Sequence, residues 1–140
     1  MNWLLDTCVL SEYVKKRPAK EVIGWLDEQD EHNLFISVIT IGEIEKGIIK
    51  LRRNNPKRSE KLTLWLGKVE ARFATRTLPL DKAILRAWAD LSGSAELEGR
   101  RLPVMDALLM ATAQYHSLTI VTRNIQDFNQ FPHVYNPWNA

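Results

Sequence analysis

Three carboxylates in this sequence stand where a structural role does not fully account for them. Asp6 ends a short apolar, extended-looking stretch that begins at Asn2. Glu43 lies near the start of a helical pattern, and Asp106 lies in the first turn of the most apolar helical pattern in the chain. An ionised carboxylate is costly to bury unless it is paired or bound to a metal ion. These acids are therefore the residues whose types and positions suggest chemistry.

Each acid also has a purely structural interpretation, which for any single acid competes well with a chemical role. Asp6 could cap the helix that follows it, because aspartate is favoured at that position. Glu43 could be a solvated partner of Lys46, one helical turn away. Asp106 near a helix N-terminus is favoured by the helix dipole, although its neighbours on the same side are apolar. Gly47 costs a helix about 1 kcal/mol relative to alanine, which predicts a close approach beside Glu43.

Taken together, the acids predict a metal site. Ligands in an open α/β sheet bind beyond the carboxyl ends of the strands, where we expect Asp6, the Asp106 helix and the segment from Thr122 to Asp127. Carboxylates that meet there repel, and without a cation at least one has a raised pKa. Oxygen donors without histidine or thiol suit Mg²⁺ or Mn²⁺. Such ions polarise a phosphodiester and activate water, so the hypothesis is metal-assisted phosphodiester cleavage.

The elements that must position these acids follow from the pattern of apolar residues. Strands are predicted at 2–5, 34–38 and 119–122, with a brief extended piece at 76–80 and an edge strand at 134–135. Helices are predicted over about 18–27, 39–53, 59–75, 81–91 and 103–115. Gly93 and Gly99 predict that the helix after Asp81 frays into a loop over 92–101. Strands separated by helices indicate a parallel sheet with helices on both faces.

The totals describe an ordinary soluble globular domain. The 140 residues, 45% hydrophobic and 26% charged, suit one domain over residues 1–140. A single cysteine, Cys8, excludes an internal disulfide and a cysteine-based zinc site. No secretory signal and no run of about 18 apolar residues is present, so we expect a cytoplasmic protein with no membrane partner. The net charge of +2 is too small to indicate nucleic-acid binding by itself.

Four segments resemble the four motifs of the PIN domain, in order and over essentially the whole chain. The segment Leu4-Leu5-Asp6-Thr7-Cys8-Val9-Leu10-Ser11-Glu12 resembles the first PIN motif, and residues 37–48, which contain Glu43, resemble the second. The third resembles residues 106–113, and the fourth resembles Thr122-Arg123-Asn124-Ile125-Gln126-Asp127-Phe128. The chain length fits the VapC/FitB-like toxins of bacterial type II toxin–antitoxin pairs.

The resemblance implies a fold, an activity and a set of ligands. The fold would be a PIN-like three-layer α/β fold, with a parallel sheet of about five strands flanked by helices. The activity would be that of a toxin that is an Mg²⁺- or Mn²⁺-dependent endoribonuclease, cleaving RNA with metal-activated water. By motif position, Asp6, Glu43 and Asp106 become catalytic metal ligands. Thr7 and Thr122 would orient these ligands through hydrogen bonds.

Two residues are candidates for the fourth ligand of the site, Asn124 and Asp127. In many relatives a carboxylate occupies the position that here is Asn124, whereas Asp127 matches the other acidic position of the motif. An asparagine ligates through its carbonyl but contributes no charge, so both residues are candidate ligands and Asp127 is the candidate acid. Arg123, beside them, is a candidate substrate contact. Cys8 replaces the usual asparagine or serine, and we interpret it as a packing variant, not a nucleophile.

The resemblance also implies an RNA substrate, a homodimer and a cognate antitoxin that occludes the site. An alternative function is a catalytically weak or inactive PIN module that binds RNA or a partner, and Asn124 keeps this alternative open. A phosphotransferase with Asp6 as nucleophile usually needs a second aspartate two residues later, where this chain has Cys8. The basic run from Lys50 to Lys61 could follow an RNA backbone, but a solvated helix end is the simpler interpretation.

Overall fold

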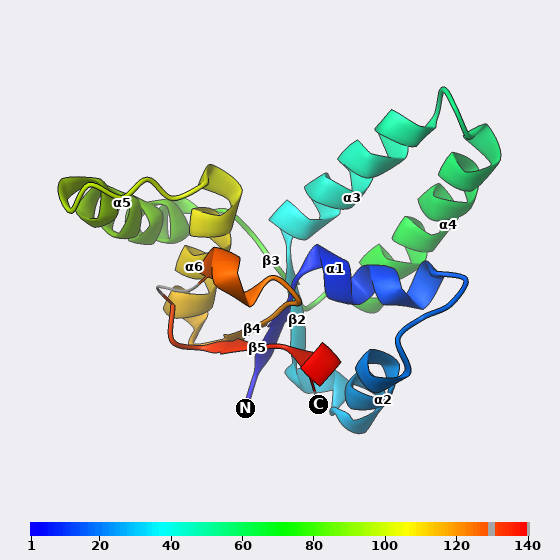
Figure 1. The fold of residues 1–140 in the computed structure, drawn as a ribbon, viewed down its shortest axis with the longest axis horizontal. Helices are drawn as coiled ribbons and strands as arrows, with labels where there is room; N and C mark the ends of the chain where they lie inside the picture. The colour runs from blue at the N-terminus through cyan, green and yellow to red at the C-terminus, as the bar shows by residue number, and fades with distance from the viewer. Residues whose placement is uncertain (129–130, 140) are drawn as a thin grey trace.

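A five-stranded parallel sheet forms the centre of the protein in the computed structural model, which describes residues 1–128 and 131–139 (Figure 1). The strand order is β3-β2-β1-β4-β5, and each neighbouring pair is parallel. The strands are short: β1 Trp3–Leu5, β2 Leu34–Ser37, β3 Thr77–Leu78, β4 Thr119–Val121 and β5 Val134–Tyr135. The predicted α/β fold with about five parallel strands is confirmed.

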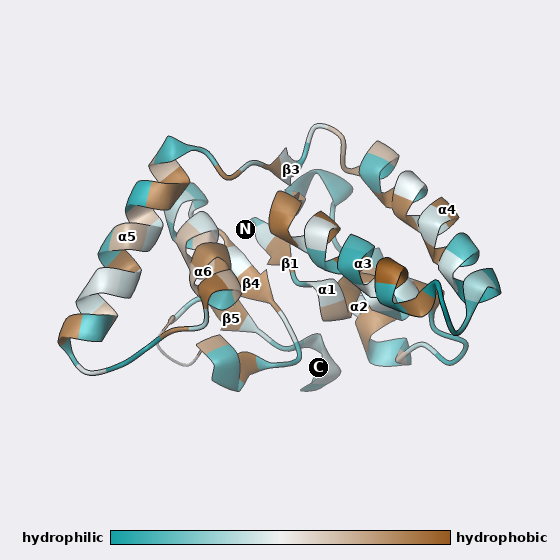
Figure 2. Cartoon of the chain, turned by 90° about the horizontal axis from the view of Figure 1, so that it is seen from above, coloured by the Kyte–Doolittle hydropathy of each residue, from teal (hydrophilic) through white to brown (hydrophobic). Residues whose placement is uncertain are grey.

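Helices cover both faces of this sheet. They are α1 Thr7–Leu10, α2 Lys20–Glu28, α3 Val38–Leu51, α4 Pro56–Arg72, α5 Lys82–Leu97 and α6 Val104–His116. Short 3₁₀ helices are η1 Ser11–Val14, η2 Glu31–Asn33, η3 Ile125–Phe128 and η4 Pro137–Asn139. From above, α5 and α6 lie on one side of the strands and α3 and α4 on the other (Figure 2).

Two hydrophobic clusters hold these layers together, and the strands contribute to both. Leu4 and Ile120 belong to the cluster that contains the buried side of α6, whereas Leu5 and Val121 belong to the cluster under α1 to α4. Successive side chains of a strand point to opposite faces of the sheet. Strands of only three residues therefore bury apolar side chains on both faces, as expected for a parallel sheet.

The helix boundaries depend on polar caps that the apolar pattern did not locate. Strand β2 ends at Ser37, not at Val38, because the Ser37 hydroxyl oxygen accepts a hydrogen bond from the Ile39 N–H and caps α3. Helix α4 begins at Pro56 instead of near Ser59. Asn55 caps it by accepting from the Arg58 N–H at 3.1 Å, and proline suits the first helical position.

The prediction that the helix after Asp81 frays at residue 92 is wrong. Helix α5 continues through Gly93 to Leu97, with Ala95 buried. It ends in a Schellman turn, in which the Arg100 N–H bonds to the Ala95 carbonyl at 2.9 Å and Gly99 has a φ of +77°. Helix α5 packs against α6, and the burial of Ala95 in the last turn offsets the low helix propensity of Gly93.

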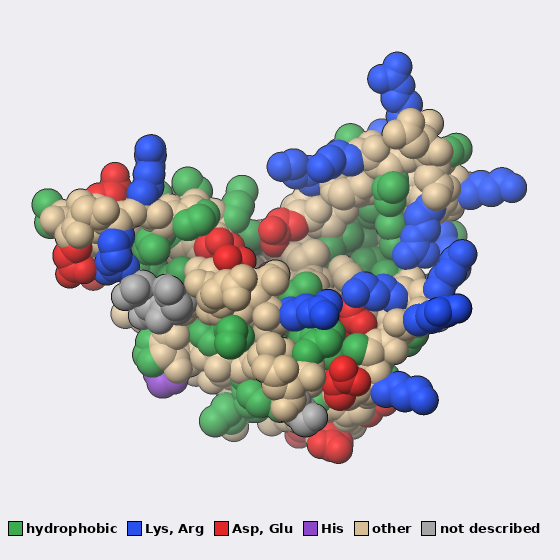
Figure 3. All heavy atoms as spheres, viewed as in Figure 1, with side chains coloured by type: hydrophobic (Ala, Val, Ile, Leu, Met, Phe, Trp, Pro, Cys, Tyr) green, Lys and Arg blue, Asp and Glu red, His purple; other side chains and the backbone are tan. Residues whose placement is uncertain are grey.

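The α3–α4 hairpin projects from the body of the molecule, and the surface is hollowed between this hairpin and the α5–α6 side (Figure 3). Acidic side chains lie on both sides of that hollow, and lysine and arginine side chains surround the hairpin. Within residues 1–128 and 131–139, none of the helices combines the length and apolar composition that crossing a membrane requires.

Candidate functional site

The segments that follow the three central strands lie together at the carboxyl ends of these strands. Strands β2, β1 and β4 are neighbours in the sheet, so the residues that follow them lie side by side. The Asp6 N–H donates to the Val121 carbonyl at 3.0 Å, which extends the β1–β4 pairing by one residue. Asp6 and the segment after β4 are thereby placed next to each other, although they are more than a hundred residues apart in sequence.

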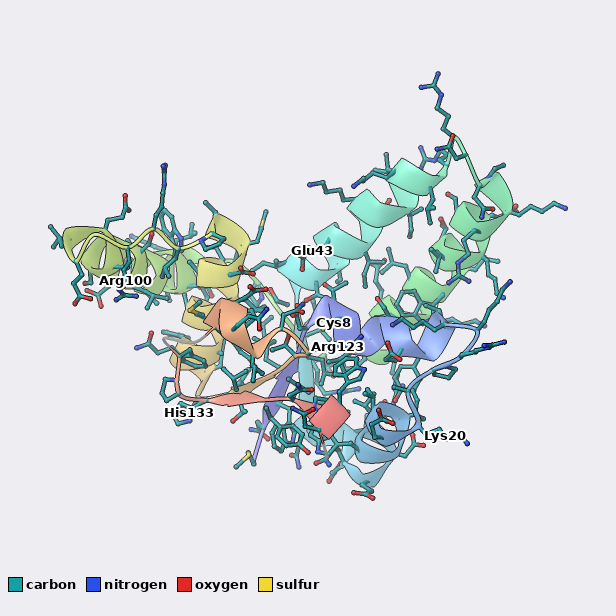
Figure 4. The ribbon with its side chains drawn as sticks, in the orientation of Figure 1. Cys8, Lys20, Glu43, Arg100, Arg123 and His133 are labelled. Carbon is teal, nitrogen blue, oxygen red and sulfur yellow. The ribbon has the colours of Figure 1, made fainter. Side chains whose placement is uncertain are left out.

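All five predicted metal-ligand candidates line one pocket of about 360 Å³. They come from the end of β1, from α3, from the first turn of α6 and from the segment after β4: Asp6, Glu43, Asp106, Asn124 and Asp127. Thr7 and Cys8 complete the polar part of the wall, and the apolar part consists of Ile39, Met105, Leu109 and Phe128. In Figure 4, Glu43 on α3 and Cys8 on α1 lie at this end of the sheet.

Asp6 caps a helix and faces the pocket at the same time. Its Oδ1 accepts from the Thr7 N–H at 2.8 Å, which makes Asp6 the N-cap of α1. Its Oδ2 accepts from the hydroxyl of Thr122, also at 2.8 Å. Oδ2 also accepts a weak hydrogen bond from the Cys8 thiol at 3.8 Å, whereas Oδ1 retains a further lone pair for a cation. The structural role and the ligand role proposed for Asp6 are therefore compatible, and the cap fixes the orientation of the carboxylate.

Thr7 connects Asp6 to the second acid. Its hydroxyl donates to Glu43 Oε1 at 2.9 Å, joining the start of α1 to α3 across 36 positions of sequence. Loss of solvent raises the pKa of Glu43, and the charge of Asp6 adds to this effect. The hydrogen bond from Thr7 and the charge of Lys46 act in the opposite direction without cancelling it.

The prediction of a close approach at Gly47 is wrong. A Cβ added there would meet nothing within 4 Å. Gly47 instead lines an open cavity of about 570 Å³ beside the acidic pocket, together with apolar side chains that include Val38, Leu80 and Met105. The absence of a side chain at Gly47 therefore enlarges this cavity and does not make room for a packed neighbour.

Asp106 shows that the acids act on one another. Burial raises the pKa of Asp106, and the negative charges of Asp127, Asp6 and Glu43 raise it further. A cation among these groups would relieve that repulsion, and the oxygen donors suit a hard divalent ion such as Mg²⁺ or Mn²⁺. In the described part of the chain, no three acidic, histidine or cysteine side chains are already gathered as a metal ligand set. The acids surround the pocket without converging on one point.

The segment after β4 is ordered around the hydroxyl of Thr122. This fully buried side chain donates to Asp6 and accepts from the Asn124 N–H at 3.1 Å. The Asp127 N–H donates in turn to the Asn124 carbonyl at 3.0 Å, where η3 begins. Asn124 and Asp127 both face the pocket, so the fold brings both candidates for the fourth ligand to the same site.

Cys8 lies inside the site as a thiol. Its Sγ is 3.8 Å from Asp6 Oδ2 and accepts from the Arg123 N–H at 3.5 Å. Burial raises the pKa of the Cys8 thiol, and the charge of Asp6 also raises it, which together outweigh the hydrogen bonds from Arg123 and Thr122. A protonated thiol is a poor nucleophile, which supports the interpretation of Cys8 as a packing residue.

Arg123 lies just outside the pocket and meets a residue that sequence reasoning missed. Its guanidinium carbon is 5.4 Å from the ring centroid of Trp138 in η4. The pocket walls Met105 and Phe128 were also missed, although each directly follows or precedes a candidate acid in the sequence. No local signal points to Trp138, because it reaches Arg123 only through the packing of the C-terminal segment.

Comparison with known proteins places this chain in a family. The PIN domain family matches residues 3–134. Toxin FitB of Neisseria gonorrhoeae is 33% identical over 142 residues, covering 97% of this chain and 98% of FitB. VapC ribonuclease Y4jK of Sinorhizobium fredii is 32% identical, covering 96% of each chain.

Solved structures agree with the sequence relatives. The crystal structure of FitAcB from Neisseria gonorrhoeae superposes with a TM-score of 0.89 at 33% identity, covering 99% of both chains. FitAB bound to a DNA fragment superposes with a TM-score of 0.88 at 31% identity, covering 99% of this chain and 96% of that one. The fold, the four acidic segments and these relatives lead to one conclusion: the chain belongs to the PIN-domain family and, within it, to the VapC/FitB-like toxins.

Proposed function

We propose that this protein is the toxin of a type II toxin–antitoxin pair and acts as an Mg²⁺- or Mn²⁺-dependent endoribonuclease. The observation that carries the proposal is that four acids and Asn124 line one pocket at the carboxyl end of the sheet. Relatives that span nearly the whole chain support it, since one is named a toxin and another a ribonuclease.

In this proposal the residues of the chain hold and orient a divalent cation. Asp6, Glu43 and Asp106 would be ligands, and Asp127 or Asn124 would complete the set. When bound, the cation supplies positive charge that offsets the acids and polarises the RNA phosphate for attack by water. Thr122 fixes Asp6, and Thr7 fixes Glu43, so that both carboxylates are oriented before an ion or substrate arrives.

Replacing single acids tests the activity. Asp6→Asn and Asp106→Asn should each reduce cleavage of a short single-stranded RNA by more than about 100-fold, because the loss of a mere partner of a ligand already costs 10–100-fold. Circular dichroism should show an intact fold. Excess EDTA should abolish cleavage by the unaltered protein and added Mn²⁺ should restore it. Full activity in excess EDTA would contradict the mechanism.

The fourth ligand is tested by comparing Asp127→Ala with Asn124→Ala. We expect Asp127→Ala to weaken Mn²⁺ binding more, because Asp127 carries the charge that acts on Asp106. Isothermal titration calorimetry measures both affinities under the same conditions. If neither variant binds Mn²⁺ more weakly than the unaltered protein, the proposed fourth position is wrong.

The alternative is a weakly active or inactive PIN module that binds RNA or a partner, and the neutral Asn124 is the observation that favours it. Expression of the chain alone in bacteria discriminates the two. Growth arrest that Asp6→Asn abolishes supports the toxin. Unaffected growth with soluble protein supports the binding module.

We further propose two protein partners, a cognate antitoxin that covers the acidic pocket and a second copy of this chain. The FitAB and FitAcB structures are the similar solved proteins that support an antitoxin. The homodimer is supported by the exposed apolar residues that line the 570 Å³ cavity, among them Val38, Leu80 and Met105.

A further inference from the structure

Among the residues that the structure describes, no lysine or arginine side chain lines the acidic pocket. An RNA strand that enters must still place the phosphates flanking the scissile one near this cluster of carboxylates. Positive charge at the rim lowers that electrostatic cost. The rim residues therefore decide how the strand is held.

Arg123 is suited to this role by its position in the chain. It lies between Thr122, which bonds to Asp6, and Asn124, which lines the pocket. Its backbone N–H is bonded to Cys8 Sγ, so the main chain is fixed against the pocket wall. The side chain is exposed. A free arginine side chain loses considerable rotamer entropy when it binds, so a support for the guanidinium favours binding.

Trp138 is such a support. Its ring lies 5.4 Å from the guanidinium carbon, within the range of a cation–π interaction. The indole is itself held in place, because its backbone N–H donates to Asn136 Oδ1 at 2.8 Å and its side chain packs against the core under α1 to α4. A guanidinium that stacks on an aromatic face keeps its in-plane N–H groups available for a phosphate.

We propose that Trp138 is a positioning residue, which holds the Arg123 guanidinium at the rim of the acidic pocket so that it binds an RNA phosphate next to the scissile one. This inference rests on the proposed ribonuclease function. Trp138 acts through Arg123 and touches no reacting atom. The C-terminal segment thereby contributes to substrate binding from ten residues beyond the fourth motif, which ends at Phe128.

Three single variants and one double variant test the inference by steady-state cleavage of a short single-stranded RNA in Mn²⁺. Trp138→Leu keeps an apolar side chain but removes the aromatic face, and it should raise KM roughly two- to fivefold, the range of an exposed cation–π interaction. Trp138→Phe keeps an aromatic face and should restore KM to near the original value. Arg123→Ala should raise KM at least as much as Trp138→Leu. The double variant Trp138→Leu/Arg123→Ala should be no worse than Arg123→Ala alone.

Nuclear magnetic resonance of arginine Nε–H groups supplies a readout that needs no activity. The Arg123 signal, identified by its loss in Arg123→Ala, should carry a ring-current shift that persists in Trp138→Phe and disappears in Trp138→Leu. Thermal unfolding of both Trp138 variants shows whether a change in KM accompanies a loss of stability.

Several outcomes would overturn the inference. They are an unchanged KM in Trp138→Leu, equal impairment in the leucine and phenylalanine variants, or additive effects in the double variant. An Arg123 signal without a ring-current shift would also overturn it. If the unaltered protein cleaves no RNA, the proposed function fails by that result alone, and the resonance experiment still decides whether Trp138 holds Arg123.

Discussion

At the scale of single residues, Thr122 is the polar side chain on which the site depends most. Its hydroxyl joins the Asp6 carboxylate to the backbone of Asn124, and the side chain is fully buried. Removing such a group leaves the shape of the core but frees a carboxylate and an N–H. Groups that orient metal ligands typically contribute 10–100-fold to metal affinity.

Thr122→Val should therefore weaken Mn²⁺ binding by roughly 10- to 100-fold, measured by isothermal titration calorimetry. Thr122→Ser keeps the hydroxyl and should bind nearly as tightly as the unaltered protein. Thr119→Val, at the other end of β4, is the matched control and should have no effect on binding. Equal affinities in the Thr122 and Thr119 valine variants would show that the hydroxyl does not orient a ligand.

The raised pKa of Asp106 predicts a dependence of stability on pH in the metal-free protein. A carboxyl whose folded pKa lies above its unfolded value stabilises the fold fully below the unfolded pKa, about 4, and loses this contribution as the pH rises through the folded pKa. Asp106→Asn should accordingly raise the midpoint of thermal unfolding at pH 7 in EDTA. The difference should shrink toward pH 4 and below.

Asp90→Asn, an exposed position on α5, is the matched control for Asp106→Asn. It removes the same charge away from the pocket and should not reproduce the gain at pH 7. Mn²⁺ should stabilise the unaltered protein at pH 7, because an ion that binds only the folded state raises its stability. A lower midpoint for Asp106→Asn at pH 7 in EDTA would contradict the repulsion described here.

At the scale of elements, the two glycines of the α5 region have opposite requirements. Gly93 lies within the helix, and an added Cβ would meet nothing within 4 Å. Gly99 lies just beyond the helix with a φ of +77°, a conformation that costs a non-glycine residue roughly 1–2 kcal/mol.

Gly93→Ala should therefore stabilise the protein by about 0.5–1 kcal/mol. Gly99→Ala should destabilise it by about 1 kcal/mol. Each change corresponds to a shift of roughly 3 °C in the thermal midpoint of a domain of this size. Because the substitution is the same at both positions, each variant is the control for the other. Shifts of the same sign would contradict the Schellman turn.

The bounds of helices and strands were predicted well where the apolar periodicity was strong, and poorly where a contact with another part of the chain, or a single capping side chain, set the boundary. The short strand before Asp6 and the helix after Pro103 were predicted from local pattern. The last turn of α5 was missed, because the packing of α5 against α6 and the burial of Ala95 override the low helix propensity of Gly93. The start of α4 at Pro56 was missed, because the Asn55 cap is a single polar side chain and not a periodic signal.

At the scale of the whole molecule, the exposed apolar surface beside the acidic pocket predicts association of two copies. Met105, which lines the 570 Å³ cavity, is 56% exposed, and its sequence neighbour Val104 is 58% exposed. Surfaces of this kind on a soluble protein mark interaction sites. A charge introduced in such an interface is costly to bury without a partner.

Met105→Glu should shift the protein from dimer to monomer, measured by sedimentation equilibrium at micromolar concentration. Leu97→Glu is the control, because Leu97 is 91% exposed at the end of α5 and away from the cavity. It should leave the mass unchanged. A monomeric unaltered protein, or a dimer that persists in Met105→Glu, would exclude this surface as the interface.

The sequence by itself determined which residues carry charge and oxygen donors, in what order, and that strands alternate with helices. That was sufficient to predict the α/β fold, the single sheet and the candidates Asp6, Glu43 and Asp106, because local pattern and residue type are properties of short segments. The ambiguity between Asn124 and Asp127 also originates there, since both are donors in one short motif.

Only the tertiary structure decided which of these residues meet. The order β3-β2-β1-β4-β5 places Asp6 beside Thr122, the packing of α3 brings Glu43 to the Thr7 hydroxyl, and the C-terminal segment sets Trp138 against Arg123. Each of these contacts joins residues from different elements. Such contacts depend on how the whole chain packs its two apolar clusters, and no short stretch of sequence encodes that.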